Sequence, residues 1–152
     1  MIDIRAARPS DATALARLRY EFRAALASPT ELRDAFVARC AEWMSTELGG
    51  GGAWRAWVAV DDERIVGQVW VHLIEKVPNP VGERHRHAYL SSLYVTPAAR
   101  GGTGTRLLQT ALDWAAAQEV DRVVLWPSAR SRSLYLRHAF VSAGEVLELT
   151  LR

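Results

Sequence analysis

The stretch Leu93-Tyr-Val-Thr-Pro-Ala-Ala-Arg-Gly-Gly-Thr-Gly-Thr-Arg-Leu-Leu108 is the most informative part of this chain. It begins as an apolar strand, turns at a proline, and passes through a basic, glycine-rich loop directly into a helix. Glycines let the backbone approach a ligand closely and adopt positive φ. The first N–H groups of a helix have no intrahelical acceptor and lie at the positive end of the helix dipole. With Arg100 and Arg106 beside it, the loop predicts a site for a phosphate-bearing ligand.

Two known phosphate-binding motifs fit this stretch poorly. A P-loop requires a lysine directly after its last glycine, but the only lysine of the chain, Lys76, lies far upstream of Gly104. A dinucleotide fingerprint requires a third small residue and a carboxylate at the end of the next strand. Leu107 occupies the third small position, and the strand predicted to end at Trp126 carries no carboxylate there. A nucleotide-binding protein is therefore the least favoured interpretation.

The segment 94–104, Tyr-Val-Thr-Pro-Ala-Ala-Arg-Gly-Gly-Thr-Gly, resembles the signature V-x-P-x-x-R-G-x-G-x-G/A of the GCN5-related N-acetyltransferase (GNAT) family, which binds acetyl-coenzyme A. In that family the signature follows the fourth strand and opens the third helix. The family usually has R-x-x-G-x-G/A, and here the spacing from Arg100 is one residue shorter if Gly102 and Gly104 are the two glycines. Without a gap, Thr103 and Thr105 occupy those positions, so two alignments of the loop stay open.

A second signature lies downstream, in residues 125–140. This segment resembles the family's strand-to-helix motif N-x-x-A-x-x-L-Y-x-x-x-G-F. Ser128 stands in place of the usual asparagine and Ala139 in place of the usual glycine, while the Leu134-Tyr135 pair and its distance to Phe140 match. Because both motifs occur in the family's order and separation, the resemblance covers the whole chain.

Length and composition predict one globular domain over residues 1–152. The chain is 49% hydrophobic and 24% charged, which is ordinary for a domain with a real core. A formal net charge of +2 gives no reason to expect a nucleic acid or a membrane as partner. Cys40 is the only cysteine, so no internal disulfide is expected, and no apolar run approaches the roughly 18 residues of a membrane span. We expect a soluble, cytoplasmic protein.

Hydrophobic periodicity and turn residues predict the element order β-α-α-β-β-β-α-β-α-β. We expect helices beginning near residues 10 and 30 and spanning 105–118 and 130–138, and strands at 2–7, 54–60, 65–74, 88–95, 122–126 and 140–151. Hairpin-linked strands followed by helix-linked strands predict an α/β fold with a mixed, mainly antiparallel central sheet and helices on both faces. The resemblance implies, in addition, that the fourth and fifth strands splay apart around the pantetheine arm.

The resemblance implies three groups of residues for acetyl-coenzyme A. The backbone of Leu93, Tyr94 and Val95 would pair with the pantetheine amides like an added strand, and one of its N–H groups would polarise the thioester. Ser128 would bond the pantetheine arm, and Arg132 or Arg130 would approach the phosphates. The pyrophosphate would be held by the loop residues Arg100, Gly101, Gly102, Thr103, Gly104 and Thr105.

Tyr135 matches the general acid of the family, since a phenol with a pKa of about 10 is protonated at neutral pH and can donate to a departing thiolate. For the base, Glu75 at the end of the third strand is the first candidate, ahead of Glu83, His87 and His72. The His-x-His pair at 85–87 lacks a third ligand, so we expect no metal site.

These features predict an acetyl-coenzyme A-dependent N-acetyltransferase that moves the acetyl group to a primary amine of a small molecule or peptide by direct attack on the thioester. A non-catalytic acyl-coenzyme A-binding or regulatory module is the alternative, favoured by the shortened loop and opposed by Tyr135. The acceptor pocket is expected between the two N-terminal helices and the loop 77–86. Its arginines fit a carboxylated acceptor and a solvated helix face equally well. By resemblance, a homodimer is expected.

Overall fold

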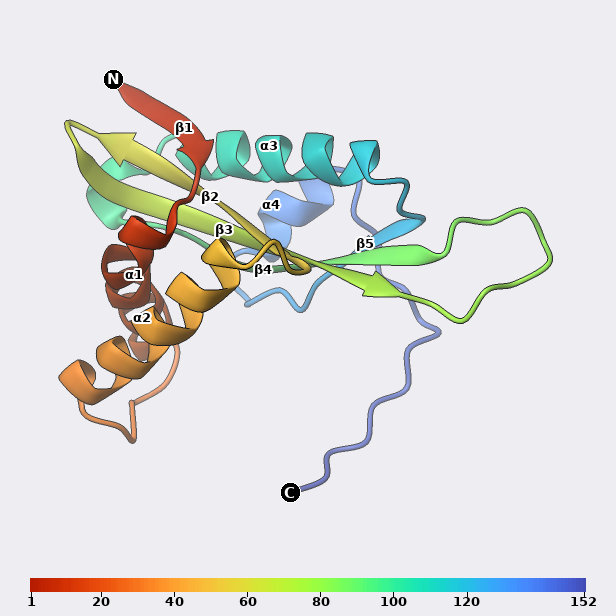
Figure 1. The fold of residues 1–152 in the computed structure, drawn as a ribbon, viewed down its shortest axis with the longest axis horizontal. Helices are drawn as coiled ribbons and strands as arrows, with labels where there is room; N and C mark the ends of the chain where they lie inside the picture. Colours follow the sequence, from red (N-terminus) through yellow and green to blue (C-terminus); the bar gives the residue numbers. More distant parts are fainter.

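The computed structural model describes residues 1–152, arranged around one five-stranded sheet in the order β1-β2-β3-β4-β5 (Figure 1). The first four strands are antiparallel to their neighbours, while β4 and β5 are parallel, as strands joined through a helix permit. The predicted mixed, mainly antiparallel sheet is therefore confirmed. The strands are β1 (Ile2–Ala6), β2 (Trp54–Asp61), β3 (Arg64–Glu75), β4 (Arg86–Val95) and β5 (Arg122–Val124).

Helices cover both faces of the sheet, as predicted. The helices α1 (Ala12–Ala24) and α2 (Arg33–Gly49) lie on one face, and α3 (Thr103–Ala117) lies on the other (Figure 1). The short helix α4 (Arg132–Arg137) follows β5 and packs on the α3 side through Tyr135. None of these helices combines the length and the apolar character needed to cross a bilayer.

The alternation of side chains along β2 divides the core into two clusters, because successive residues of a strand point to opposite faces. Trp57 and Ala59 belong to the cluster under α3, whereas Ala56 and Val58 belong to the cluster under α1 and α2. Each helix contributes the apolar residues of one face to the cluster below it. The cluster under α3 contains Leu107, Leu108, Ala111 and Ala115, and the cluster under α1 and α2 contains Leu15, Ala16, Val37 and Met44.

One buried polar side chain joins α1 to the sheet. Gln68 on β3 is 0% exposed, its Nε2 donates to the carbonyl oxygen of Leu15 at 3.1 Å, and its Oε1 accepts from Nε1 of Trp70 at 2.8 Å. Both ends of the amide are therefore satisfied, as a buried polar group requires. The bonds fix α1 over the middle of the sheet.

The strand predicted at 140–151 is not formed. Residues after α4 belong to no helix or strand, and the apolar side chains of Leu147 and Leu149 are 96% and 81% exposed. An alternating apolar pattern shows only that a segment can form a strand. To join the sheet, the segment must also lie beside the free edge of another strand in the correct register. The last strand of the sheet, β5, is three residues long and stops at Val124, two residues earlier than predicted.

Gln68→Leu is expected to lower the free energy of unfolding by about 1–3 kcal/mol, because it leaves the buried Nε1 of Trp70 without an acceptor while nearly preserving volume. Urea denaturation measures the change. The control Gln109→Leu removes an exposed amide, bonded only to Asp113, and is expected to shift the free energy by less than about 0.5 kcal/mol. Equal effects of the two substitutions would contradict the structural role of Gln68.

Candidate ligand-binding cleft

Strands β4 and β5 pair over only three residues. His87–Tyr89 of β4 lie opposite Arg122–Val124, and beyond this point the two strands part. The edge of β4 from Leu90 to Val95 therefore has no strand beside it on that side. This is the splay that the family resemblance implied, and the structure confirms it. A free strand edge presents N–H and C=O groups to which an extended ligand can bond.

A bulge interrupts β4 where the two strands part. Gln68 lies opposite Tyr94 and Trp70 opposite Ser91, so the single residue between Gln68 and Trp70 faces both Ser92 and Leu93. Ser92 has a φ of 57°, in the left-handed region. The extra residue shifts the alternation, so both Ser91 and Ser92 face the α1 side, with their Oγ atoms 3.4 Å apart.

The glycine-rich loop turns through two residues in the left-handed region. Gly101 and Gly102 have φ values of 120° and 102°, and α3 begins at the next residue. The first intrahelical bond of α3 is donated by the N–H of Arg106 to the carbonyl oxygen of Gly102 at 3.1 Å. The N–H groups of residues 103–105 therefore have no intrahelical acceptor, which leaves them available to a ligand at the start of α3.

Some side chains of this loop line the cleft, and others hold the loop in place. Gly104 and Thr105 line the cleft, whereas Thr103 is buried and its Oγ1 donates to the carbonyl oxygen of Ala99 at 2.8 Å. Only the backbone N–H of Thr103 is left for a ligand. Nε of Arg100 donates to the carbonyl oxygen of Val95 at 3.0 Å, so this arginine also fastens the loop to the end of β4.

The phosphate-side cleft, defined by its lining residues, has a volume of about 580 Å³. Predicted residues meet there from three separate segments: the end of β4, the glycine loop and the turn before α4. The end of α1 closes the cleft, and Phe22 of α1 stacks on Tyr94 at 5.3 Å between ring centroids. The lining includes Phe22, Ala25, Leu26, Leu93, Tyr94, Val95, Arg100, Gly101, Gly102, Gly104, Thr105, Ser128 and Leu134.

Two predicted arginines do not reach this cleft. Nη1 of Arg106 donates to the carbonyl oxygen of Ile2 at 2.8 Å, on β1, and Nη2 of Arg132 donates to Oγ of Ser142 at 2.9 Å. Arg130 and Arg137 line the cleft instead. Arg130 lies in the turn before α4 and Arg137 is the last residue of α4, and no sequence motif pointed to Arg137.

Ser128 begins the turn into α4. Its Oγ lies 2.8 Å from Oγ of Ser131, and its N–H donates to that same oxygen at 3.1 Å. Ser128 lines the phosphate-side cleft as predicted, but its hydroxyl also holds the start of the helix.

A middle cavity of about 320 Å³ adjoins this cleft and shares Leu93 and Ser128 with it. Tyr135 lines the middle cavity, is 7% exposed, and packs its ring on Phe140 at 5.4 Å. Burial raises the pKa of Tyr135 to about 12. The hydroxyl makes no hydrogen bond within the protein, and it stays protonated throughout the physiological range. It is therefore a neutral donor in the cavity that Ser92 and Leu93 of the bulge also line.

An aromatic cavity of about 480 Å³ lies on the other side of the middle cavity, and the two share Arg19, Tyr89, Ser91 and Ser92. Trp43 contacts Trp54 at 5.6 Å and Trp70 at 5.7 Å between ring centroids. The helices α1 and α2, which were predicted to form the acceptor pocket, line this cavity together with β2, β3 and β4, whereas the loop 77–86 does not.

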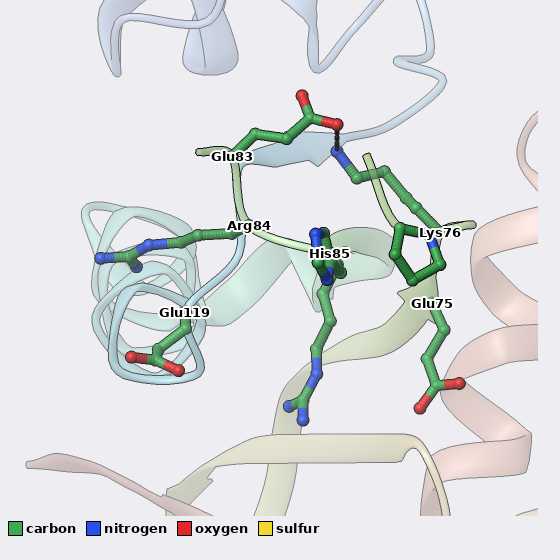
Figure 2. A pocket seen from close by; sticks show the side chains of 8 residues that line it. Glu75, Lys76, Glu83, Arg84, His85 and Glu119 are labelled. Atoms are coloured by element: carbon green, nitrogen blue, oxygen red, sulfur yellow. Dashed lines mark ion pairs between the residues drawn. The ribbon is translucent and has the colours of Figure 1, made fainter. Parts of the chain in front are cut away.

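Glu75 lies elsewhere, at the far end of β3 opposite Arg86. It lines a separate polar pocket of about 570 Å³, in which its carboxylate points away from the ion pair of Lys76 and Glu83 (Figure 2). Six residues of extended chain separate Glu75 from the bulge, which is about 20 Å. The structure therefore does not bring Glu75 into the cleft, and Glu83 stays with it in the polar pocket.

The other two base candidates are also outside the three cavities. His87 is the second residue of β4, opposite Ile74, and His72 packs on Trp54 at 4.6 Å between ring centroids without lining the aromatic cavity. Lys76 also pairs with Asp121, whose other oxygen accepts the N–H of Arg84 at 2.9 Å. These bonds fasten the loop to the turn before β5. No three His, Cys, Asp or Glu side chains lie close enough together to hold a metal ion.

Comparison with protein families gives one match. The model of the Acetyltransferase (GNAT) family matches residues 18–140. Among curated protein sequences, none matches the chain significantly.

Solved structures share the fold at low sequence identity. A predicted acetyltransferase from Clostridium acetobutylicum, in a crystal structure with acetyl-CoA, is 20% identical, with a TM-score of 0.84 over 99% of this chain and 97% of its own. A GCN5-related N-acetyltransferase from Ralstonia eutropha is 22% identical, with a TM-score of 0.78 over 99% of both chains. A ribosomal-protein-alanine N-acetyltransferase from Brucella melitensis is 23% identical, with a TM-score of 0.66 over 100% of this chain and 99% of its own.

Gly102→Ala is expected to lower the free energy of unfolding by about 1–3 kcal/mol, because alanine is strained at a φ of 102°. Gly104→Ala is expected to raise it by up to about 1 kcal/mol. Gly104 lies inside α3 in an ordinary conformation, and a Cβ there would meet Val95 only at 3.9 Å. Denaturant unfolding of both variants tests the geometry of the loop. If both substitutions changed the free energy of unfolding in the same direction, the described geometry of the loop would be wrong.

Proposed function

Because the chain is a member of the GNAT acetyltransferase family, we propose that residues 1–152 form one N-acetyltransferase domain that moves the acetyl group of acetyl-CoA to a primary amine. The observation that carries the proposal is the phosphate-side cleft. It combines a free strand edge, a glycine-rich helix start and three arginines in a single groove. The likeness in fold to the Clostridium acetyltransferase with acetyl-CoA supports the same co-substrate.

Acetyl-CoA is proposed to lie along the cleft with its pyrophosphate at the start of α3. The N–H groups of residues 103–105 would bond the phosphate oxygens, and Arg130 and Arg137 add positive charge at the same cleft. The pantetheine arm would follow the free edge of β4 beyond Tyr89 and bring the thioester to the bulge at Leu93. The structure keeps Arg132 and Glu75 out of this arrangement.

The proposed chemistry is direct transfer. The amine nitrogen attacks the thioester carbon, a backbone N–H of the β4 edge stabilises the oxyanion, and the C–S bond breaks. Tyr135 would donate its proton to the departing thiolate, since its raised pKa keeps the hydroxyl protonated. Cys40 does not suit an acyl-enzyme intermediate, because burial raises the pKa of its thiol and keeps it neutral.

No base of the usual kind faces the reacting position. None of the residues lining the phosphate-side cleft, the middle cavity or the aromatic cavity is a carboxylate or a histidine. The proton of the incoming ammonium is therefore proposed to leave to water before attack. The fraction of neutral amine then sets the pH dependence of the reaction.

A non-catalytic acyl-CoA-binding module is the second candidate, because the loop is one residue shorter than usual and serine replaces asparagine at position 128. Tyr135 favours the enzyme. Its hydroxyl has no hydrogen-bond partner in the protein, and its position in the wall of the middle cavity suits a proton donor.

We also propose that the protein is cytoplasmic and forms a homodimer. A homodimer is supported by the exposed apolar side chains of residues 146–151, which present a strand-like segment without a partner. Sedimentation of the full chain over a range of concentrations tests the assembly, and a monomer throughout would remove it.

Coenzyme A is expected to raise the melting temperature by about 5–10 °C at 100 times its Kd, whereas ATP and NAD at equal concentration leave it unchanged. Gly104→Ala should reduce the shift, because a Cβ there enters the cleft beside the free N–H groups. The control Gly144→Ala lies outside the cleft with nothing within 4 Å of the added Cβ, and should keep the full shift. Absence of any shift with coenzyme A would overturn the proposal.

Tyr135→Phe is expected to lower kcat by about 10²-fold with little change in KM for acetyl-CoA, because it removes the proton donor and keeps the ring. For the native protein, kcat/KM should rise with pH as the amine loses its proton. It should show no descending limb through pH 10, since an acid with a pKa of about 12 is still protonated there. Free thiol release measures both. Tyr20→Phe is the matched control, since Tyr20 lines none of the three cavities.

Full activity of Tyr135→Phe would remove this residue as the acid. Coenzyme A binding without turnover of any amine would favour the binding module.

A further inference from the structure

Arg19 is a partly buried charge without a counter-ion. It projects from α1, and its Nη1 donates to Oγ of Ser92 at 3.0 Å. Arg39 lines the same aromatic cavity but is paired, with Nε and Nη2 donating to Glu31 at 2.8 and 2.7 Å. Arg19 forms no ion pair, and burial lowers its pKa. An unpaired charge withdrawn from water is costly, so an anionic ligand at this guanidinium would be favoured.

Arg19 lies next to the position at which acetyl transfer is proposed. Arg19 lines both the middle cavity, which contains Tyr135 and Leu93, and the aromatic cavity beyond it. The bulge in β4 places the Ser92 hydroxyl against its guanidinium. An anion bound there lies beside the position at which acetyl transfer is proposed, so the acceptor must carry its negative charge close to its amine.

The rest of the acceptor must fit the aromatic cavity. Trp54 contacts Trp43 at 5.6 Å, Trp70 at 6.1 Å and Tyr89 at 6.1 Å between ring centroids, and the cavity is about 480 Å³. Such walls suit an aromatic or large aliphatic group. No carboxylate lines this cavity or the middle one, so neither offers an ion pair to a polycationic acceptor.

We propose that the acceptor is an α-amino acid with an aromatic or large apolar side chain. Its carboxylate binds Arg19, its side chain fills the aromatic cavity, and its amine faces the middle cavity. The inference rests on the proposed acetyl transfer. The ammonium loses one proton to water before attack, the N–C bond to the acetyl group forms, and the C–S bond breaks. The thiolate takes a proton from Tyr135, and the second proton that the nitrogen loses restores the Tyr135 phenol. The products are an N-acetyl amino acid and coenzyme A.

Arg19 also favours the reactive form of such an acceptor. A guanidinium near an ammonium group disfavours the charged form of the amine and lowers its pKa. This effect assists deprotonation in a site whose cavities are lined by no carboxylate or histidine. The same side chain therefore binds the carboxylate and promotes the neutral amine.

The test compares three acceptors that share one ring: phenylalanine, phenethylamine and phenylalanine amide. The native protein is expected to prefer phenylalanine over the other two by about 10- to 100-fold in kcat/KM, the effect of one charged hydrogen-bonded pair. Arg19→Gln should remove this preference mainly through KM for phenylalanine, and Arg19→Lys should keep part of it. Arg17→Gln removes an exposed charge from the same helix, outside the three cavities, and should keep all of it.

The outcomes separate the two proposals. Turnover of phenethylamine or the amide equal to that of phenylalanine overturns the role of Arg19, while acetyl transfer stands. Equal turnover of glycine and phenylalanine overturns the role of the aromatic cavity. Turnover of no amine at all overturns the acetyltransferase proposal and this inference with it. Coenzyme A raising the melting temperature of Arg19→Gln as in the native protein shows that the variant is folded.

Discussion

The parting of β4 from β5 is the constraint on which the rest of the site depends. Two parallel strands held by three residue pairs leave the edge of β4 open beyond Tyr89, and the bulge at Ser92 and Leu93 then turns two successive serines to the α1 side. A regular strand would alternate these side chains, and Ser92 would point toward α3 instead. The short pairing with β5 therefore supplies the exposed backbone edge, and the bulge supplies the hydroxyl that accepts a hydrogen bond from Arg19.

The fold supports several locally unfavourable features around this opening. Ser92 and Ala139 have positive φ, which residues other than glycine rarely adopt, and Arg19 lies unpaired beside the cavities. Such features persist when the surrounding packing over-determines them. Here the surroundings are two apolar clusters on opposite faces of the sheet, together with the satisfied Gln68 amide that holds α1 in place. Loosening α1 would therefore affect the cavities that α1 lines as well as stability.

Periodicity and motif spacing predicted most of the fold from the sequence. Both helical layers, the mixed sheet and the glycine loop at the start of α3 follow from local patterns of apolar residues and glycines. Partners distant in sequence could not be predicted in this way. The alternating apolar residues in 140–151 do not show that this segment pairs with no other strand. The resemblance that placed Arg132 near the phosphates does not show that its side chain bonds Ser142 instead. The position of Glu75 at a strand end predicts a place near the site, but the length of β3 places it six residues from the bulge. The cytoplasmic location and the homodimer stay predictions.

Residue 139 departs from the family motif at a position where the backbone requires a left-handed conformation. The family usually has glycine there, and Ala139 indeed adopts a φ of 66° just after α4, where a left-handed residue ends the helix. The N–H groups of His138 and Phe140 both donate to the carbonyl oxygen of Tyr135, at 2.9 and 3.1 Å. The helix end thus keeps its hydrogen bonds at the cost of strain at one alanine. These bonds, with the packing of Phe140 on the ring of Tyr135, fix the direction of the phenol. The residues after Tyr135 therefore fix the position of this proposed acid. Alanine can adopt the left-handed conformation needed at position 139, but it does so less favourably than glycine.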